Sequence, residues 1–240
     1  AGLAQRSKTC TVAGRPSQGA VGMKTDSLPS GVWESLFPRA LALIDEISKY
    51  GGIANPFWTL GGGTVLMFRY SHRLSKDIDI FVPDPQYLGF VTPRLSDTAA
   101  DLTEDYTEQP GMFVKLQFDE GEVDFVSAPN LLNDAWETWD FRGRAVKVET
   151  AAEIIAKKMY HRGDRVTARD LFDLALVIER EPQQLLAAKP FLLRHRNVFL
   201  TQIRQPHASL RAGFDAIATL KYTPSFDHCV AVAGEFLESL

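Results

Sequence analysis

The sequence has almost no cysteine. Only Cys10 and Cys229 occur among its 240 residues, and neither has a second cysteine or a histidine at the spacing of a zinc site. A disulfide framework and a structural zinc site are therefore excluded. This scarcity of cysteine fits a protein of the reducing cytoplasm.

Long apolar runs are also missing. No run approaches the ~18 apolar residues that a membrane-spanning helix needs, and the N-terminal part lacks the apolar centre of a secretory signal. We therefore expect a soluble, unsecreted protein with no membrane partner. The net charge of −4 gives no overall attraction to nucleic acid, so a polynucleotide partner would need a local basic patch.

The N-terminal residues 1–29 have no repeating apolar face. They are rich in Ser, Thr, Gly, Lys and Arg, so they cannot bury enough surface to offset the entropy of ordering. We expect residues 1–29 to form a disordered tail. Met23 could mark the natural start, in which case the preceding stretch would be vector-derived or a misassigned leader.

The part of the chain from residue 30 to 148 has the pattern of an α/β domain. The expected elements are helices over 33–50 and 64–70, strands over 57–60, 78–82, 113–118 and 122–126, and a hairpin over 135–148. We expect the strands over 78–82, 113–118 and 122–126 to share one small mixed sheet.

The part from residue 149 to 240 has a helical pattern. Thr150 with Glu153 has the sequence of a capping box at a helix N-terminus, and Thr167 with Asp170 repeats it. Further helical segments are expected over 183–204, 207–219 and 226–240. The chain should therefore consist of an α/β front half and an all-helical back half.

A glycine turn follows the first expected strand. Gly62, Gly63 and Thr64 stand between this strand and a helix. A strand that runs into a glycine turn and a helix presents free backbone N–H groups and the positive end of the helix, which suits a triphosphate. The Thr64 hydroxyl could add a contact there.

Three aspartates stand in otherwise apolar strands. Asp77 and Asp79 are two residues apart, so they point to the same face of a strand and could hold one hard cation together. Asp124, from a later strand, could complete a site for two metals that neutralise phosphates and activate an attacking oxygen. The alternative is an exposed Asp-x-Asp turn without metal, but charged residues in apolar strands need a reason.

Two charged clusters occupy the expected helices after residue 150. Lys158 and Arg162 share one helical face, and Asp170 and Asp173 share a face of the next helix. One face is basic and the other is acidic. The alternative is a pair of solvated helices with an ion pair between Arg169 and Asp173.

Other conspicuous side chains have simpler explanations. His72 could reach a triphosphate, but a lone histidine before a strand is more often a hydrogen-bonded loop residue. Trp58, Trp136 and Trp139 are expected to pack in the core or the hairpin rather than to stack on bases.

The combined motifs occur in the runs GGGTVLMFRYSHRLSKDIDIF, EVDFVS and AAEIIAKKMYHRGDRVTARDLFDLA. This combination resembles the AbiEii/AbiGii toxin family of nucleotidyltransferases, part of the DNA polymerase β superfamily and known from abortive-infection and toxin–antitoxin systems of bacteria. The resemblance covers roughly residues 33–180. It implies a nucleotidyltransferase-like domain over 30–148 with a small mixed sheet, followed by an all-helical C-terminal domain over 149–240.

The resemblance also implies roles for single residues. The implied catalytic residues are Asp77, Asp79, Asp124, Lys158 and Asp173, of which the first three would hold metal. The implied nucleotide-binding residues are Gly62, Gly63, Thr64, Ser75, Lys158, Arg162 and Asp170. Lys158 would contact the phosphates, and Asp173 would orient Lys158 or accept a proton. Lys157 competes for the phosphate role, but Lys158 has the family's spacing to Asp173.

The function that this resemblance implies is Mg²⁺-dependent transfer of a nucleoside monophosphate from an NTP to an acceptor hydroxyl, with two ions as cofactor. The protein would be the toxin of a two-gene system with a cognate antitoxin. The 3′ end of tRNA is an expected acceptor, docked on a basic patch of Arg142, Arg144, Lys147, Arg162 and Arg165. Two alternatives remain: an enzyme of this fold that modifies a protein or a small molecule, and a degenerate domain that binds nucleotide without catalysis.

Overall fold

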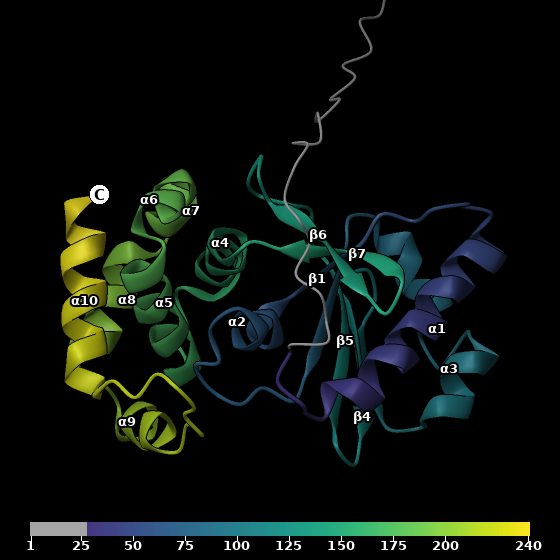
Figure 1. Ribbon diagram of the computed structural model, residues 1–240, viewed down its shortest axis with the longest axis horizontal. Coiled ribbons are helices and arrows are strands. Elements are labelled where there is room, and N and C mark those ends of the chain that lie inside the picture. The colour runs from purple at the N-terminus through teal and green to yellow at the C-terminus, as the bar shows by residue number, and fades with distance from the viewer. Residues whose placement is uncertain (1–27) are drawn as a thin grey trace, which may run out of the picture.

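The computed structural model describes residues 28–240 (Figure 1). The predicted disordered tail therefore falls outside the described residues, except for its last two. These two belong to the fold, since Leu28 packs against the hydrophobic core and the Pro29 carbonyl accepts a 2.7 Å hydrogen bond from the Trp33 indole. The tail boundary at residue 29 was placed too late.

The centre of the fold is a seven-stranded mixed sheet in the order β3-β4-β5-β2-β1-β7-β6. Its strands are β1 (Thr59–Gly61), β2 (Ile78–Val82), β3 (Tyr106–Gln109), β4 (Phe113–Phe118), β5 (Gly121–Ser127), β6 (Trp136–Phe141) and β7 (Arg144–Glu149). β2 runs parallel to β5 and β1 parallel to β7, while the other neighbours are antiparallel. The predicted mixed sheet is confirmed, but it is larger than predicted because the β6–β7 hairpin joins it through β1.

Helices on one side of the sheet complete the front half. α1 (Trp33–Gly51) packs on β2 and β5 and buries an apolar stripe that includes Leu36, Leu43 and Ile47. The short helices η2 (Pro85–Phe90) and α3 (Asp97–Leu102) lie beside α1 (Figure 1). Neither short helix was predicted, because six residues do not show a helical period clearly.

The back half is helical, as predicted. Its helices are α4 (Ala151–Arg162), α5 (Ala168–Arg180), α6 (Pro182–Leu185), η3 (Leu186–Ala188), α7 (Lys189–Leu192), α8 (Arg196–Arg204), α9 (Ala208–Asp215) and α10 (Phe226–Ser239). The segment predicted as helical over 183–204 is broken into short turns. Pro182 and Pro190 each begin a new turn, because proline has no N–H to continue the preceding helix.

Only one of the two predicted capping boxes is complete. At the start of α5, Thr167 and Asp170 exchange both hydrogen bonds of the box. At the start of α4, the Thr150 side chain accepts from the Glu153 N–H. The Glu153 carboxylate instead accepts hydrogen bonds from the backbone N–H groups of Leu131 and Leu132, in the loop between β5 and β6. The hydrogen bond from the Thr150 N–H to the Glu153 side chain, which would complete the box, is therefore absent.

The two halves are joined by more than the chain connection between β7 and α4. α2 (Gly62–Tyr70) ends in a loop that pairs with the segment before α10. In this pairing the Leu74 N–H donates to Ala218 and the Leu220 N–H donates to His72, at 2.8 and 2.9 Å. The loop that leads into β2 is therefore held by the helical half, and the proposed boundary at residues 148–149 does not separate two independent surfaces.

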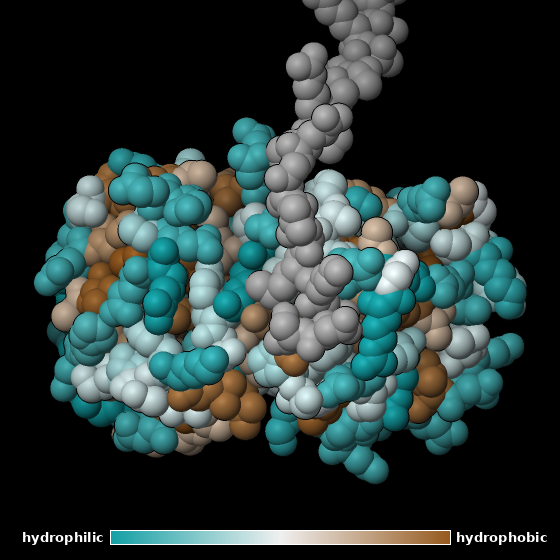
Figure 2. All heavy atoms as spheres, in the orientation of Figure 1, coloured by the Kyte–Doolittle hydropathy of each residue, from teal (hydrophilic) through white to brown (hydrophobic). Residues whose placement is uncertain are grey.

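The surface is mostly hydrophilic, with apolar side chains in small interspersed patches on the face shown in Figure 2. None of the helices within residues 28–240 combines the length and the apolar composition that crossing a bilayer requires.

Candidate functional site

A cavity of 570 Å³ lies between the sheet and α4. Most of the predicted site residues line it: Gly62, Gly63, Ser75, Asp77, Asp79, Asp124, Lys158 and Arg162. The structure therefore brings together the glycine turn, the three aspartates of the strands and the basic face of α4. The other three predicted residues, Thr64, Asp170 and Asp173, do not line this cavity.

The glycine turn is packed directly against charged side chains. Gly62 has a φ of +72°, and a Cβ added there would stand 1.8 Å from Asp79 Oδ2. A Cβ on Gly63 would stand 2.5 Å from an Arg73 guanidinium nitrogen. Both glycines are needed because a carboxylate and a guanidinium occupy the space of a side chain, and Gly62 also has a left-handed backbone conformation.

The Thr64 hydroxyl has a structural partner. Thr64 is fully buried, and its Oγ1 donates a 2.5 Å hydrogen bond to the backbone carbonyl of Asp77. In this structure the hydroxyl fixes the start of β2 against α2 and does not face the cavity. Its contact with a phosphate stays a prediction.

Two of the three aspartates are direct neighbours in the sheet. Asp79 on β2 and Asp124 on β5 are register partners in a parallel pair, and Asp77 precedes β2. Burial and the nearby Asp77 raise the pKa of Asp79. Burial and the nearby Asp79 raise the pKa of Asp124 to about 7. These three carboxylates repel one another, so a cation between them would be stabilised.

Two cationic side chains approach this acidic cluster. Lys115 Nζ lies 2.7 Å from Asp124 Oδ2 and 2.5 Å from a Glu122 oxygen. An Arg169 nitrogen lies 3.7 Å from Asp77 Oδ2. The sequence analysis does not include Lys115 among the site residues. The predicted hairpin of strands 113–118 and 122–126 did contain a signal for it, since the register of this hairpin places Lys115 opposite Asp124.

The three aspartates offer oxygen ligands to a metal, although other side chains already contact two of them. As placed, no three His, Cys, Asp or Glu side chains within residues 28–240 are grouped so that they could hold an ion, and Lys115 and Arg169 already contact two of the aspartates. However, Asp124 Oδ1 is buried without a hydrogen-bond partner within those residues. Neighbouring carboxylate oxygens are the ligands that a hard divalent cation prefers. The residues therefore fit magnesium chemically.

Asp173 is the centre of a buried ion network. Arg73 donates two 2.8 Å hydrogen bonds to its carboxylate, and Lys158 Nζ and His72 Nε2 lie 2.7 and 2.9 Å from it. Burial alone would raise the pKa of Asp173, but Arg73 and Lys158 hold it well below its ordinary value. The structure thus favours the orienting role of Asp173. A carboxylate that stays ionised in this way is a poor proton acceptor.

Asp170 also faces the basic side chains of α4. Its Oδ1 lies 3.0 Å from Lys158 Nζ and 2.7 Å from an Arg162 nitrogen. Asp170 and Asp173 are both buried, and Arg169 pairs with Asp77 rather than with Asp173. The alternative of two solvated helices linked by an Arg169–Asp173 ion pair is therefore wrong.

Lys157 has a different environment from Lys158. It is buried beside Glu149 and Glu153, with its Nζ 2.5 and 3.5 Å from their oxygens, and lies 4.0 Å from the centre of the Phe81 ring. Burial raises the pKa of Glu149, against the lowering effect of Lys157. This lysine therefore neutralises buried acids, which agrees with the choice of Lys158 for the phosphates.

The remaining predictions have mixed outcomes. His72 is a buried loop residue bonded to Asp173, and Trp58 and Trp139 are buried in the core, as predicted. The predicted basic patch is not one surface. Arg162 and Arg165 line the cavity, Arg142 and Arg144 pair with acids of α1, and Lys147 lies over Phe57 and Trp136.

Comparison with known families identifies the chain. The profile of the nucleotidyl transferase AbiEii toxin, of a type IV toxin–antitoxin system, matches residues 52–237. The chain belongs to the AbiEii family. The match extends past residue 180, where the resemblance in the sequence motifs ended, so the family pattern includes the helices after α5.

Two solved structures from Helicobacter pylori have a similar fold. A Helicobacter pylori protein described as a candidate nucleotidyltransferase is 15% identical with a TM-score of 0.52, and the match covers 88% of this chain and 95% of that one. JHP933 from Helicobacter pylori is also 15% identical, with a TM-score of 0.51 and coverage of 89% and 93%. MenT4, a nucleotidyltransferase toxin of Mycobacterium tuberculosis, is 19% identical with a TM-score of 0.46 and coverage of 78% and 77%. A comparison with curated proteins gave no significant match.

The packing at the glycine turn predicts a large effect of Gly62→Ala. An added methyl group would collide with the Asp79 carboxylate. The left-handed backbone conformation of an alanine would cost a further ~1–2 kcal/mol. Gly111→Ala is the matched control, since Gly111 has a φ of +75° but open space around its Cβ. Urea unfolding should show a clearly larger stability loss for Gly62→Ala, and equal losses would contradict the packing argument.

The acidic cluster predicts a pH-dependent effect of Asp124→Asn. The folded state raises the pKa of Asp124 from 3.8 to about 7, so wild-type stability falls as pH rises through this window. Without divalent cations, the variant should therefore be as stable as wild type or more stable at pH 8. We expect a gain of up to about 1 kcal/mol, or roughly 2–4 °C in Tm, which becomes smaller toward pH 5 and disappears only below the ordinary pKa of 3.8.

Thermal unfolding with a chelator between pH 5 and 8 measures this difference. Asp119→Asn is the control, because Asp119 is exposed in the turn of the β4–β5 hairpin and its replacement should not change the pH dependence. A loss of stability at every pH for Asp124→Asn would show that the lost ion pair with Lys115 outweighs the relief of repulsion.

Proposed function

We propose that this AbiEii-family protein is a Mg²⁺-dependent enzyme that transfers a nucleoside monophosphate from an NTP to an acceptor hydroxyl. The observation that supports this most directly is the shared cavity, in which Asp79 and Asp124 are side by side, the glycine turn is adjacent, and Lys158 faces them from α4. Asp77, Asp79 and Asp124 would hold two ions, which supply positive charge to the phosphates and to the attacking oxygen when bound.

The protein side chains have separate roles in this reaction. The backbone N–H groups at the start of α2, beginning with Gly62 and Gly63, face the triphosphate. Lys158, held by Asp173, supplies a fixed positive charge to the phosphates. Arg162 adds a second charge at the mouth of the cavity, where its side chain is 46% exposed.

The transfer step exchanges one phosphorus–oxygen bond for another. The acceptor hydroxyl oxygen forms a bond to the α-phosphorus while the bond from the α-phosphorus to the bridging oxygen breaks, and pyrophosphate leaves. The hydroxyl proton passes to water, because both oxygens of Asp124 already have a role. Oδ2 pairs with Lys115, and Oδ1, which has no hydrogen-bond partner among the described residues, would hold a cation.

We propose that the protein acts as the toxin of a two-gene system with a cognate antitoxin, in keeping with the type IV system that names its family. We further propose that the acceptor is the end of an RNA, such as the 3′ end of tRNA. Arg162 and Arg165 at the cavity mouth support an anionic acceptor, because phosphate contacts dominate binding to polynucleotides.

Incubation of the purified protein with each labelled NTP, total RNA and Mg²⁺ tests this function. We expect label to enter RNA from at least one NTP and to disappear with a chelator or with Asp79→Ala, which removes a proposed metal ligand. Label on protein would favour the alternative acceptor class. No label on any acceptor, with nucleotide still bound, would favour the degenerate nucleotide-binding module.

The two adjacent lysines should separate catalysis from stability. Lys158→Ala should lower kcat/KM by about 2–4 kcal/mol of transition-state stabilisation with a small loss of nucleotide affinity, since it removes a preorganised charge. Lys157→Ala should instead lower the free energy of unfolding by about 3–5 kcal/mol, because Glu149 and Glu153 would be left buried without their partner.

Single-turnover kinetics and urea unfolding of both variants measure this separation. Lys158→Arg serves as the charge-conserving control and should restore part of the rate. If Lys157→Ala abolished transfer in a stable protein while Lys158→Ala had no effect, the assignment of the phosphate-facing residue of α4 would be wrong by one position.

A further inference from the structure

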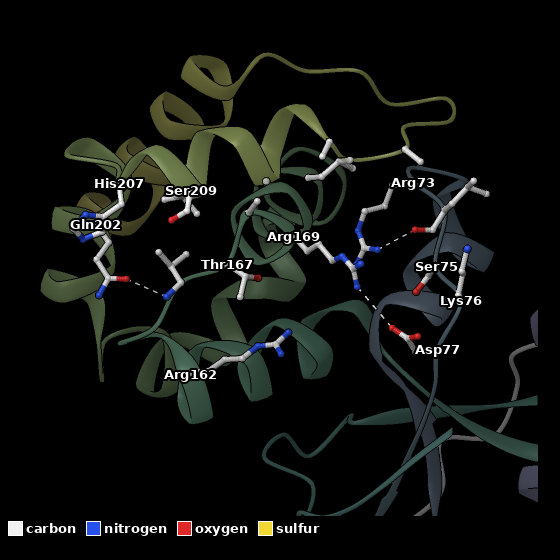
Figure 3. Close-up of a pocket in the computed structure, with 18 residues that line it drawn as sticks. Arg73, Ser75, Lys76, Asp77, Arg162, Thr167, Arg169, Gln202, His207 and Ser209 are labelled. Carbon is white, nitrogen blue, oxygen red and sulfur yellow. Dashed lines mark hydrogen bonds and ion pairs between the residues drawn. The ribbon is translucent and has the colours of Figure 1, made fainter. Parts of the chain in front are cut away.

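A second cavity, of 790 Å³, opens beside the catalytic cavity (Figure 3). It lies between the loop before β2, the start of α5, and α9 with the segment that follows it. The two cavities share the lining residues Arg73, Ser75, Asp77, Arg162 and Arg169. The second cavity therefore extends as far as the acidic cluster, and a molecule bound in it could present a group to Asp77.

Cationic side chains are prominent in the lining of the second cavity. Figure 3 shows Lys76, Arg162 and Arg169 around it, with Gln202 and Ser209 on the opposite side. Lys76 is exposed and makes no ion pair with the other residues drawn in Figure 3. Arg162 shares Asp170 with Lys158, so its charge is only partly neutralised.

Apolar residues lie among the polar ones in the lining of this cavity. They are Leu74, Val166, Leu210, Ala216, Ile217 and Ala218. Leu74 is 51% exposed, which leaves apolar surface available to a ligand. A lining that combines cationic and apolar side chains suits a molecule with flat apolar faces and a negatively charged backbone, which describes a single-stranded nucleic acid.

We infer that this second cavity is the acceptor site of the enzyme and binds the single-stranded end of an RNA. This inference rests on the proposed function, and it names the residues that recognise the acceptor. Lys76 and Arg169 contact backbone phosphates, and the apolar residues of the lining contact the face of a base. The terminal hydroxyl then lies at the shared edge of the two cavities, next to Asp77.

Arg169 has a particular position in this arrangement. It stands at the border of the two cavities, and its side chain is 64% exposed while it pairs with Asp77 at 3.7 Å. An exposed pair at this distance is weak, so a phosphate of the acceptor competes with it readily. Binding of the acceptor thus moves a positive charge from Asp77 to the RNA and leaves the Asp77 carboxylate available to a cation.

The test measures RNA binding separately from transfer. A short single-stranded RNA with a fluorophore is titrated with the full-length protein over a series of salt concentrations, without NTP, and the binding of a fluorescent NTP is measured in parallel. Lys76→Gln should weaken RNA binding and reduce the slope of log Kd against log salt by about 0.7. Its NTP binding should stay the same.

Two further variants make the test specific. Gly213→Leu adds apolar volume inside the cavity, and its Cβ meets only ordinary contact with Ala168 at 3.5 Å. It should weaken RNA binding severalfold at every salt concentration without a change of slope. Lys189→Gln, at an exposed position outside both cavities, removes the same charge as Lys76→Gln and should bind RNA like wild type.

The outcomes distinguish this inference from the proposed function. Wild-type RNA binding in Lys76→Gln and Gly213→Leu, no RNA binding by the wild type, or transfer of label to protein would each overturn the acceptor site. In the last case nucleotidyl transfer itself would still stand. Absence of any transfer by a wild-type protein whose RNA binding depends on these residues would overturn the proposed function while the RNA site remains.

Discussion

The position of Lys158 depends on one buried carboxylate, that of Asp173. Asp173 on α5 is bonded to Arg73 and His72 from the loop before β2 and to Lys158 from α4. A buried carboxylate of this kind is tolerable only because its partners neutralise it and satisfy its oxygens. The same bonds connect the sheet with two helices, so the distance between the glycine turn and the lysine is set by this network.

The acidic cluster has the opposite energetic character. Asp77 contributes to the raised pKa of Asp79, and Asp79 to the raised pKa of Asp124. A fold selected for stability alone would not place these three carboxylates together. Lys115 and Arg169 offset part of the repulsion from outside the cluster. Local instability at a binding site, compensated by surrounding contacts, is the expected sign of function.

Much of the fold was predictable because its main elements have clear periods. The helix at 33–50 and the strand at 78–82 correspond closely to α1 and β2. The missing parts had no such signal. η2 and α3 are too short to show a helical period. Prolines stand in the first turns of α6 and α7, and the edge strand β3 (Tyr106–Gln109) is half-buried or exposed at every position.

The site was predictable only in part, for a related reason. Acidic residues in apolar strands are visible in the sequence, and the sheet places them at one cavity. Their cationic partners come from other elements. Arg73 and Asp173 are 100 residues apart, and no local pattern links them. Lys115 is an exception, since it stands opposite Asp124 in a hairpin whose register could be derived from its turn.

The two lysines of α4 show why spacing alone could not settle their roles. Adjacent residues on a helix point about 100° apart, so Lys157 and Lys158 must enter different environments. Lys157 reaches Glu149 at the end of β7, and Lys158 reaches Asp173 on α5. Both lysines line the cavity, and each compensates a buried acid. Their different environments therefore follow from which acid each one meets in the folded structure.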